Sequence, residues 1–361
     1  MRIVIPGGTG QVGVVLRRAL AAAGHDVVVL SRRPETLEPG VRHVVWDGRS
    51  GGAWEREVDG ADAVVNLAGR SVSCRYSDRN LRAMMDSRVD STRAVGAAIA
   101  RAERPPRVWL QMSTATIYAD TRGPAHDEAT GVIGGEEPDV PLYWEYSVRI
   151  ARRWEAAQQA ADLPTTRRVA LRTAMVMSPD RGGIFDYLSW LARLGLGGPV
   201  AGGGQFVSWI HADDLVRAVV LLLERDDLAG PVNLAAPGPV PQRELMRGLR
   251  HAWGGRPGLP ATRWMAGLGA FVLRSDPELL LKSRRVVPGR LLDAGFTFEH
   301  PAWDAAAADL VHRARQARRA RSSAQALRSR TATLTRSSAS SPASTSPAWT
   351  SHERSGAHSP S

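Results

Sequence analysis

Short apolar runs alternate with longer amphipathic segments along the first 235 residues of the chain. A short apolar run bounded by turn residues indicates a buried strand, and apolar positions three and four residues apart indicate a helix. On this basis we predict strands over residues 2–5, 26–30, 42–45, 62–66, 107–112, 168–172 and 231–234. We predict helices over residues 11–23, 78–103, 143–161, 183–194, 212–224 and 241–252. Strands that alternate with helices indicate an α/β fold with a parallel sheet and crossover helices.

The pattern changes after residue 235, where several prolines interrupt the chain. Apolar segments at 264–273 and 278–281 follow, and they predict a small mixed α/β region over 236–312. From residue 313 the chain is rich in Arg, Ala, Ser and Thr and poor in large apolar residues. Such a composition buries too little apolar surface to offset the entropy of ordering, so we predict a disordered tail over 313–361, helical at most to about residue 320. The predicted first region is 1–235.

The formal net charge of +11 is concentrated in this tail. Residues 313–361 hold nine arginines and one glutamate, which leaves only +3 of the +11 for residues 1–312. The tail lacks the interleaved aromatic side chains that stack on bases, so we expect a solvated extension rather than a nucleic-acid site. The single cysteine, Cys74, excludes an intrachain disulfide and is typical of a reducing compartment. Since the chain shows no membrane span and no signal-peptide pattern, we expect a cytoplasmic protein.

The segment IPGGTGQVG, at residues 5–13, joins the first predicted strand to the first predicted helix. Gly7, Gly10 and Gly13 have the spacing of a dinucleotide-binding turn. One glycine allows the tight turn, one lets the backbone approach a pyrophosphate, and one lets the helix pack closely on the strand. The first helical residues, Gln11 and Val12, would then point the helix N-terminus at the phosphates. The alternative is a purely structural turn.

The residues after the second predicted strand indicate which dinucleotide binds. A site for NAD holds the ribose 2′-hydroxyl with a carboxylate at this place. Here Ser31, Arg32 and Arg33 end the strand, and Asp26 lies at its opposite end. A guanidinium matches a 2′-phosphate in charge and in donor geometry. We therefore predict NADP rather than NAD, with NADPH preferred over NADH, against the alternative of a solvated basic loop.

The fourth predicted strand runs into the small-residue turn NLAG. This turn supplies three further candidates for cofactor contact, Leu67, Ala68 and Gly69, and its small residues would leave room for the adenosine and ribose portions of the cofactor. Arg88 follows on the long predicted helix, where it either reaches a cofactor phosphate or pairs with an acid such as Asp86 or Asp90.

Together with MSTATIYAD at 112–120, these stretches resemble the extended short-chain dehydrogenase/reductase superfamily. Longer motifs resemble one branch of it, the atypical "epimerase family" proteins with a small C-terminal domain of unknown function. These motifs are DSRVDSTRAV (86–95), LGGPVAGGGQFVSWIHADDL (196–215), GPVNLAAPGPV (230–240) and VVPGRLLDAGFTFEHP (286–301). The resemblance covers residues 1–312 and implies a Rossmann-type, doubly wound parallel sheet that binds NADP(H). By superfamily habit it also implies a homodimer formed through the helix at 78–103.

The resemblance also implies a catalytic arrangement. In this superfamily a tyrosine exchanges a proton with the substrate, a lysine four residues later lowers the pKa of the phenol, and a Ser or Thr hydroxyl positions the substrate oxygen. These roles fall on Thr114 and Tyr146, but Ile150 stands where the lysine is expected, a gap that the branch commonly shares. A phenol without a cationic neighbour has a pKa of about 10, so at neutral pH it serves better as an acid in carbonyl reduction than as a base.

Four residues are candidates for contact with the substrate: Arg172, Gln205, Trp209 and His211. Arg172 ends a predicted strand, and ligands of open α/β sheets bind outside the carboxyl ends of the strands. His211 has a second interpretation, which we favour: SWIHADDL has the form of a helix start, with Asp213 and Asp214 in the first turn. Because no second and third ligand stand at metal spacing from His211, we expect no metal site.

Two functions follow from these observations. The first is an NADP-dependent oxidoreductase or epimerase-like enzyme that acts on an unknown small carbonyl or hydroxyl compound. The second is a non-catalytic NADP(H)-binding sensor or scaffold, which the missing lysine favours.

Overall fold

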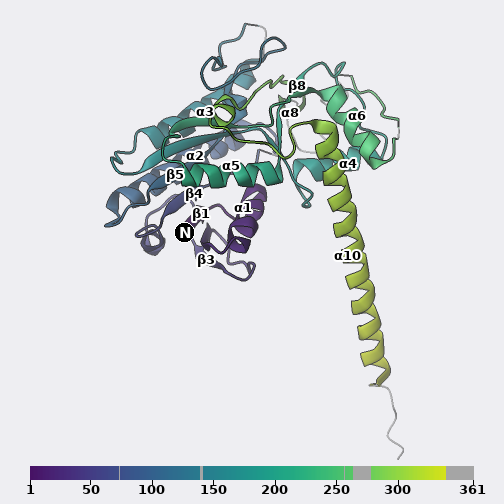
Figure 1. Cartoon of the computed structure of the whole chain (residues 1–361), viewed down its shortest axis with the longest axis horizontal. Coiled ribbons are helices and arrows are strands. Elements are labelled where there is room, and N and C mark those ends of the chain that lie inside the picture. Colours follow the sequence, from purple (N-terminus) through teal and green to yellow (C-terminus); the bar gives the residue numbers. More distant parts are fainter. Residues whose placement is uncertain (73, 139–140, 256, 263–277, 339–361) are drawn as a thin grey trace, which may run out of the picture. The chain divides into compact units, whose positions relative to one another are not determined.

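The computed structural model describes residues 1–72, 74–138, 141–255, 257–262 and 278–338 (Figure 1). The strands are β1 (Arg2–Pro6), β2 (Asp26–Ser31), β3 (Val41–Val45), β4 (Ala63–Asn66), β5 (Val108–Thr114), β6 (Arg167–Thr173), β7 (Met175–Met177), β8 (Phe206–Val207), β9 (Trp209–His211), β10 (Gly230–Leu234) and β11 (Val240–Pro241). The helices are α1 (Gln11–Ala22), α2 (Asp78–Arg101), α3 (Leu142–Gln159), α4 (Ile184–Arg193), α5 (Ala212–Glu224), α6 (Gln242–Trp253), α8 (Glu278–Leu281), α9 (Gly289–Asp293) and α10 (Trp303–Ser338), with 3-10 turns η1 (Ala53–Glu57) and η2 (Ala115–Ile117). The predicted segment 264–273 lies outside the described residues.

Seven strands form one parallel sheet in the order β10-β6-β5-β4-β1-β2-β3. Each neighbouring pair is parallel, and β1 lies between β2 and β4 with Val4 opposite Val28 and Val64. All seven strands of this sheet were predicted. The order reverses between β1 and β4, which is the arrangement of a doubly wound dinucleotide-binding sheet. The predicted α/β fold class is confirmed.

Alternate residues of the central strands are buried against helices on opposite faces of the sheet. Ile3 and Ile5 of β1 share a core with Leu16 of α1 and with the apolar face of α5. Val4, between them, belongs to the opposite core together with the inner side of α2. Helix α3 packs beside α2 on that second face (Figure 1). Because burying one such side chain is worth about 1.5–3 kcal/mol, these two layers fix the register of the sheet.

A separate hydrophobic core, in addition to the two on the faces of the sheet, forms around Trp209, which lies in the short strand β9. Helices α4 and α6 and the first turns of α10 pack around this side chain, and Trp303 meets it edge-on with ring centroids 5.0 Å apart. Strand β9 pairs in parallel with β7, and β8 pairs in antiparallel fashion with β11. None of these four strands was predicted. They are two or three residues long, too short to show an alternating pattern.

Residues 1–314 form one compact unit, and the described residues from Arg315 onward belong to a second. The predicted regions 1–235 and 236–312 both fall within the first unit. Helix α10 continues to Ser338, although the composition predicted disorder from about residue 320. Alanine and arginine have high intrinsic helix propensity, which a composition argument based only on burial overlooks.

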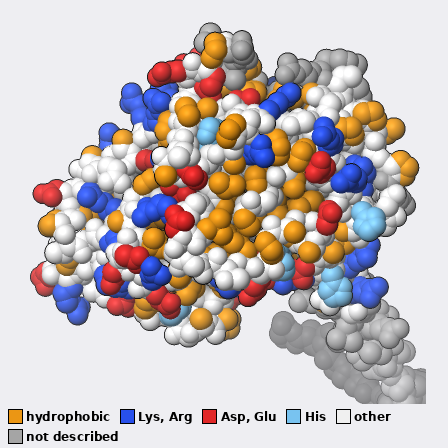
Figure 2. Space-filling view, turned by 45° about the horizontal axis from the view of Figure 1, so that its top comes forward, with side chains coloured by type: hydrophobic (Ala, Val, Ile, Leu, Met, Phe, Trp, Pro, Cys, Tyr) orange, Lys and Arg blue, Asp and Glu red, His pale blue; other side chains and the backbone are white. Residues whose placement is uncertain are grey.

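Charged side chains of both signs lie around an area of hydrophobic ones on the face that Figure 2 shows. This mixture agrees with the small net charge of residues 1–312. In the described ranges no helix is both long and apolar enough to cross a bilayer.

Candidate cofactor and active site

The turn between β1 and α1 requires glycine at two positions. Gly7 has φ +77°, and a Cβ there would lie 2.7 Å from the backbone of Ala68. A Cβ on Gly13 would lie 2.5 Å from the backbone of Gly8, so α1 can pack this closely on the turn only without a side chain. A Cβ on Gly10 would meet only the Gly7 carbonyl, at 3.5 Å, so Gly10 instead leaves open space at the helix start.

The N-terminus of α1 presents backbone N–H groups beside this open space. Gly10 caps the helix in an extended conformation, and the first turn begins Gln11-Val12-Gly13 without an acidic residue. Helix N-termini of this kind attract anions, because unpaired N–H groups and the helix dipole both favour negative charge. Gln11 Nε2 donates to the Arg181 carbonyl at 2.9 Å, which ties the loop after β7 to the helix start. The turn therefore fits a pyrophosphate, as its sequence predicted.

The end of β2 carries the predicted basic residues at the surface. Ser31 Oγ donates to the Arg33 carbonyl at 3.0 Å and lies 2.8 Å from His43 Nε2, which fixes the bend after the strand. Arg32 and Arg33 are exposed. Asp26 lies at the far end of β2, within 3.9 Å of the Arg2 guanidinium. The two residues that directly follow this strand, Arg32 and Arg33, are thus both cationic, which fits a 2′-phosphate.

The NLAG turn is held in place by a buried amide pair. Asn66 Nδ2 donates to Gln111 Oε1 at 2.9 Å, and Asn66 Oδ1 accepts from the Ala68 N–H at 3.1 Å. The Leu67 N–H donates to the Pro6 carbonyl, which joins this turn to the glycine turn. Gly69 lies against Arg88, since a Cβ there would be 3.3 Å from Arg88 Cγ. The predicted cofactor residues at the ends of β1 and β4 therefore lie together.

Thr114 is the last residue of β5, directly before η2, and Tyr146 lies on α3, which packs against η2. Thr114 caps η2, and its Oγ1 accepts from the Thr116 N–H at 3.2 Å. Because that bond uses a lone pair, the Thr114 hydroxyl hydrogen stays available for a substrate oxygen. Tyr146 is half-buried, and the Arg149 guanidinium lies 4.6 Å from its ring centroid. Ile150 is buried one turn further on, so this face of α3 presents hydrocarbon where the superfamily has lysine.

Arg172 lies in a buried network below the sheet edge. Its guanidinium pairs with both carboxylate oxygens of Glu155, at 2.8 and 2.9 Å, and donates to the Tyr118 hydroxyl at 2.9 Å. Ser113 Oγ also donates to Glu155, at 2.6 Å, and Tyr118 donates to Asn233 Oδ1 at 3.0 Å. This network therefore joins β5, β6, β10 and α3, and each of the three guanidinium nitrogens of Arg172 donates to a protein partner.

Gln205 and Trp209 are likewise buried, with exposed fractions of 2% and 0%. Gln205 Nε2 donates to the Val200 carbonyl at 3.2 Å, and Trp209 Nε1 donates to the Gly238 carbonyl at 3.0 Å. The sequence interpretation placed both on a substrate wall, but Trp209 packs in the hydrophobic core between α4, α6 and α10, and Gln205 is buried on a backbone carbonyl. The presence of aromatic and amide residues in a motif does not by itself show whether their side chains line a substrate pocket or pack in the protein interior.

The sequence was compared with models of known protein families. The sequence model of the NAD dependent epimerase/dehydratase family matches residues 3–235. The chain belongs to this family. A domain of unknown function, DUF1731, matches residues 266–310 of the same epimerase-family chain.

Individual relatives agree with this assignment. The human epimerase family protein SDR39U1 is 30% identical over 316 residues, which cover 86% of this chain and 100% of the human protein. An epimerase family protein of Mycobacterium tuberculosis is 32% identical, covering 82% of this chain and 93% of the relative. The crystal structure of human SDR39U1 (isoform 2) with NADPH matches with a TM-score of 0.75 at 29% identity, over 86% of this chain and 99% of that one. The resemblance and the Rossmann-type fold are confirmed.

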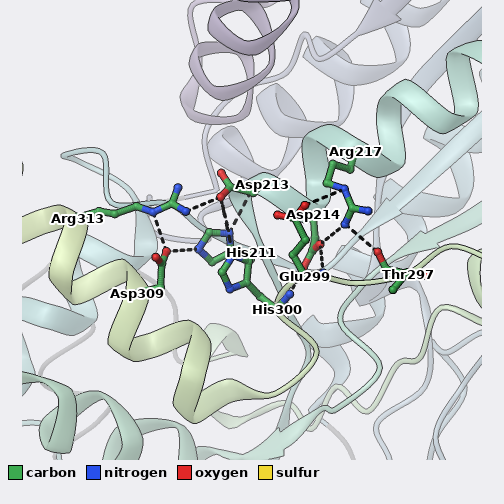
Figure 3. Close-up of polar contacts among 9 residues, drawn as sticks. All are labelled: His211, Asp213, Asp214, Arg217, Thr297, Glu299, His300, Asp309 and Arg313. Carbon is green, nitrogen blue, oxygen red and sulfur yellow. Dashed lines mark hydrogen bonds and ion pairs between the residues drawn. The ribbon is translucent and has the colours of Figure 1, made fainter.

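His211 of this epimerase-family chain caps α5, which is the interpretation favoured from the sequence (Figure 3). Its Nδ1 accepts from the Asp213 N–H at 3.1 Å, and its Nε2 lies 3.2 Å from Asp309 Oδ2. The ring stacks on His300 with centroids 3.7 Å apart. Burial first, and then His300, lower the pKa of His211 to about 4. The side chain is thus a neutral, structural residue that joins α5 to α10.

Two further residues that could bind a metal lie beside His211, although none stands at metal spacing from it in the sequence. The fold brings His300 and Asp309 to it, with ligand atoms within 4.8 Å of one another. Sequence spacing could not show this, because about 90 residues separate these side chains. However, a neutral imidazole has one lone pair, and His211 uses it to cap α5, so its Nε2 carries the proton. The Arg313 guanidinium also lies 2.7 Å from a carboxylate oxygen of Asp213 and of Asp309 (Figure 3). It therefore balances the negative charge of these two carboxylates, as a metal cation would.

A polar cluster that the sequence did not reveal lies against η2. Lys282 Nζ donates to the Thr116 carbonyl at 3.1 Å, and Arg284 Nε donates to the Thr116 hydroxyl at 3.1 Å. Glu278 accepts from Ser147 Oγ, next to Tyr146, at 2.5 Å. Burial, and then Arg284, lower the pKa of Lys282 to about 8. One signal was available: Lys282 is the only lysine of a chain with 47 basic side chains.

Proposed function

We propose that the chain binds NADP(H) and uses it as an oxidoreductase or epimerase-type enzyme on a small carbonyl or hydroxyl compound. One observation carries this proposal. The glycine turn, where Gly7 and Gly13 exclude any side chain, opens beside an acid-free helix N-terminus and a cationic strand end. These features fit a pyrophosphate and a ribose 2′-phosphate. The human relative, which was solved with NADPH, supports the same cofactor.

In this proposal the residues of the site divide into four groups. Gly7, Gly10, Gln11, Val12 and Gly13 surround the pyrophosphate, while Ser31 and Arg32 hold the 2′-phosphate. Leu67, Ala68, Gly69 and Arg88 line the next part of the cofactor. When bound, the nicotinamide supplies or accepts a hydride. Thr114 donates a hydrogen bond to the substrate oxygen, and Tyr146 supplies the proton in carbonyl reduction.

Titration of the protein with NADPH and NADH tests this proposal. Arg32→Gln removes a charge-assisted bond to the 2′-phosphate, which is worth about 1.5–3 kcal/mol, so NADPH affinity falls about 10–100-fold. NADH affinity stays unchanged, and Arg49→Gln, at an exposed turn outside the site, changes neither. Equal affinity for the two cofactors in the wild type would contradict the 2′-phosphate assignment. If neither binds, the glycine turn is structural and the proposal fails.

A sensor or scaffold without catalysis is the second candidate, and buried Ile150 in place of the lysine favours it. Oxidation of NADPH with a panel of small aldehydes and ketones distinguishes the two. Turnover that is lost in Tyr146→Phe supports the enzyme. Tight NADPH binding with no turnover across the panel supports the sensor.

We also propose a homodimer formed through α2 and α3. A groove of about 530 Å³ runs between these helices and is lined mainly by small residues such as Gly96, Ala97, Ala100, Ala156 and Ala157. Light scattering should then give a mass twice the 38.9 kDa of one chain. The mass of one chain at micromolar concentration would refute the dimer.

A further inference from the structure

The two proposed catalytic side chains come from different elements of the fold. Thr114 ends β5, and Tyr146 lies on α3. Since both would act on the same substrate oxygen, their relative position has to be fixed, and a displacement of about 1 Å can lower a rate about 100-fold. One segment from the far end of the chain, residues 278–284, contacts both elements or the turn that directly follows them.

The first contact holds the turn of α3 that carries Tyr146. Ser147, its neighbour in the chain, donates from Oγ to Glu278 Oε2 at 2.5 Å. Glu278 begins α8 and is fully buried. A hydrogen bond to an ionised carboxylate is roughly twice as strong as one between neutral groups. Glu278 therefore anchors this turn of α3.

The second contact holds the turn after β5, through Thr116. Arg284 Nε donates to Thr116 Oγ1 and Lys282 Nζ donates to the Thr116 carbonyl, both at 3.1 Å. The Thr116 N–H in turn donates to Thr114 Oγ1 at 3.2 Å. Because its N–H, carbonyl and hydroxyl are all engaged, Thr116 cannot turn without breaking a bond to a buried cation. The two cations thus fix the N–H that orients the Thr114 hydroxyl.

An ion pair joins these two contacts. Arg284 Nη2 lies 3.9 Å from Glu278 Oε1, and both side chains are buried. Desolvation offsets much of the attraction between buried charges, so such a pair adds little net stability, but it constrains where its members lie. A continuous series of contacts therefore runs from α3 to the end of β5, through Ser147, Glu278, Arg284, Thr116 and Thr114.

We propose that three side chains of this segment are positioning residues, which hold the Thr114 hydroxyl in register with Tyr146. They are Glu278, Lys282 and Arg284. They act through the chain neighbours of the two catalytic side chains and not on the substrate itself. This inference rests on the proposed function. It assigns a role to the C-terminal region that the DUF1731 model matches, since this region would complete the active site.

The rotamer of Thr114 tests the inference without cofactor or substrate. NMR of protein with isotopically labelled threonine methyl groups gives this rotamer from the couplings between the methyl carbon and the backbone. The wild type should show one rotamer, and Arg284→Met should show an average of several, because Thr116 loses a bond. Arg285→Met is the matched control. It removes the same charge one residue further on, from a side chain that donates to the Gly123 carbonyl, and should leave the Thr114 rotamer unchanged.

Turnover gives a second readout, which a residue that only supports the fold would not satisfy. Arg284→Met should lower kcat for a carbonyl compound about 10–100-fold while NADPH affinity stays within about twofold of the wild type. In a Thr114→Val background Arg284→Met should cause no further loss, because no hydroxyl remains to be positioned. A residue that only supports the fold would lower turnover in both backgrounds. If no compound is turned over, the rotamer alone decides.

Three results would overturn the inference: one Thr114 rotamer in every variant, an averaged rotamer in the wild type, or a further loss of turnover in the Thr114→Val background. If Arg284→Met does not fold, Thr116→Val removes only the hydroxyl that receives the bond and should give the same averaging. Failure of the proposed function looks different. The wild type would then bind no NADPH, although the Thr114 rotamer would still depend on Arg284.

Discussion

Acidification should destabilise this protein through His211, which must be neutral to cap α5. In the folded chain its Nδ1 accepts the Asp213 N–H, and protonation would replace that lone pair with a second donor. Burial, with His300 and then Arg313, outweighs the opposing effect of Asp213 and Asp309, so the pKa falls to about 4. An unfolded histidine has a pKa of about 6.5. Between these values the unfolded chain binds more protons, so the free energy of unfolding falls as the pH drops through this window.

The size of the effect follows from the two pKa values. One pKa unit is worth about 1.4 kcal/mol, so the distance from about 6.5 to about 4 amounts to about 3 kcal/mol. The loss begins near pH 6.5 and is complete near pH 4. Above pH 6.5 this side chain contributes no pH dependence.

Urea denaturation at several pH values between 4 and 7.5 measures the effect. His211→Asn keeps a side-chain acceptor that caps helices well and does not titrate, so its stability should fall by about 3 kcal/mol less than that of the wild type across this range. His251→Asn, at an exposed position near the end of α6, should behave like the wild type. Equal pH dependence in the wild type and His211→Asn would refute the reasoning. So would a wild type that gains stability on acidification.

Three further predictions concern single side chains. Gly7→Ala places a Cβ on a residue with positive φ and 2.7 Å from the backbone of Ala68, so the loss in free energy of unfolding should exceed the ~1–2 kcal/mol of backbone strain. Gly10→Ala, in contrast, should unfold in urea like the wild type but bind NADPH more weakly, because its Cβ enters the open space at the start of α1. Tyr118→Phe removes a buried hydroxyl with two polar partners and should lower the free energy of unfolding by about 2 kcal/mol; a loss under ~0.5 kcal/mol would contradict the network. Since Lys282 is the only lysine, NMR of lysine-labelled protein should show one side-chain amine that titrates near pH 8, and at higher pH in Arg284→Gln; titration above pH 10 would exclude the buried site.

The sequence predicted the parts of the site that depend on local spacing. The glycine turn, the cationic end of β2 and the capping residue of α5 each occupy consecutive residues, so their backbone geometry follows from a few neighbours. All seven strands of the large sheet were likewise visible, because each is a short apolar run between turn residues. The role of Tyr146 stays a prediction that rests on resemblance.

The rest depends on contacts between distant segments, which no local pattern encodes. The sequence placed Arg172 at the ligand edge of the sheet, but its partner Glu155 lies on α3, and the sequence does not show which face of that helix is turned toward β6. His211 gained His300 and Asp309 from the far end of the chain. Trp209 and Gln205 looked like wall residues because a motif does not state which side of a short strand faces the interior.

Residues 282–284 bond to the segment after β5, and these bonds have a consequence for the order in which the chain folds during synthesis. Ser283 bonds to Asp120, and Lys282 and Arg284 bond to Thr116, partners that are synthesised more than 160 residues earlier. At about 5–20 residues per second, the glycine turn and most of the sheet leave the ribosome many seconds before this segment exists. The nucleotide end of the molecule can therefore form first, and the edge that carries Thr114 is completed last. A chain that is cut or stalled after residue 235 would keep the nucleotide turn but leave the Thr114 edge unfinished.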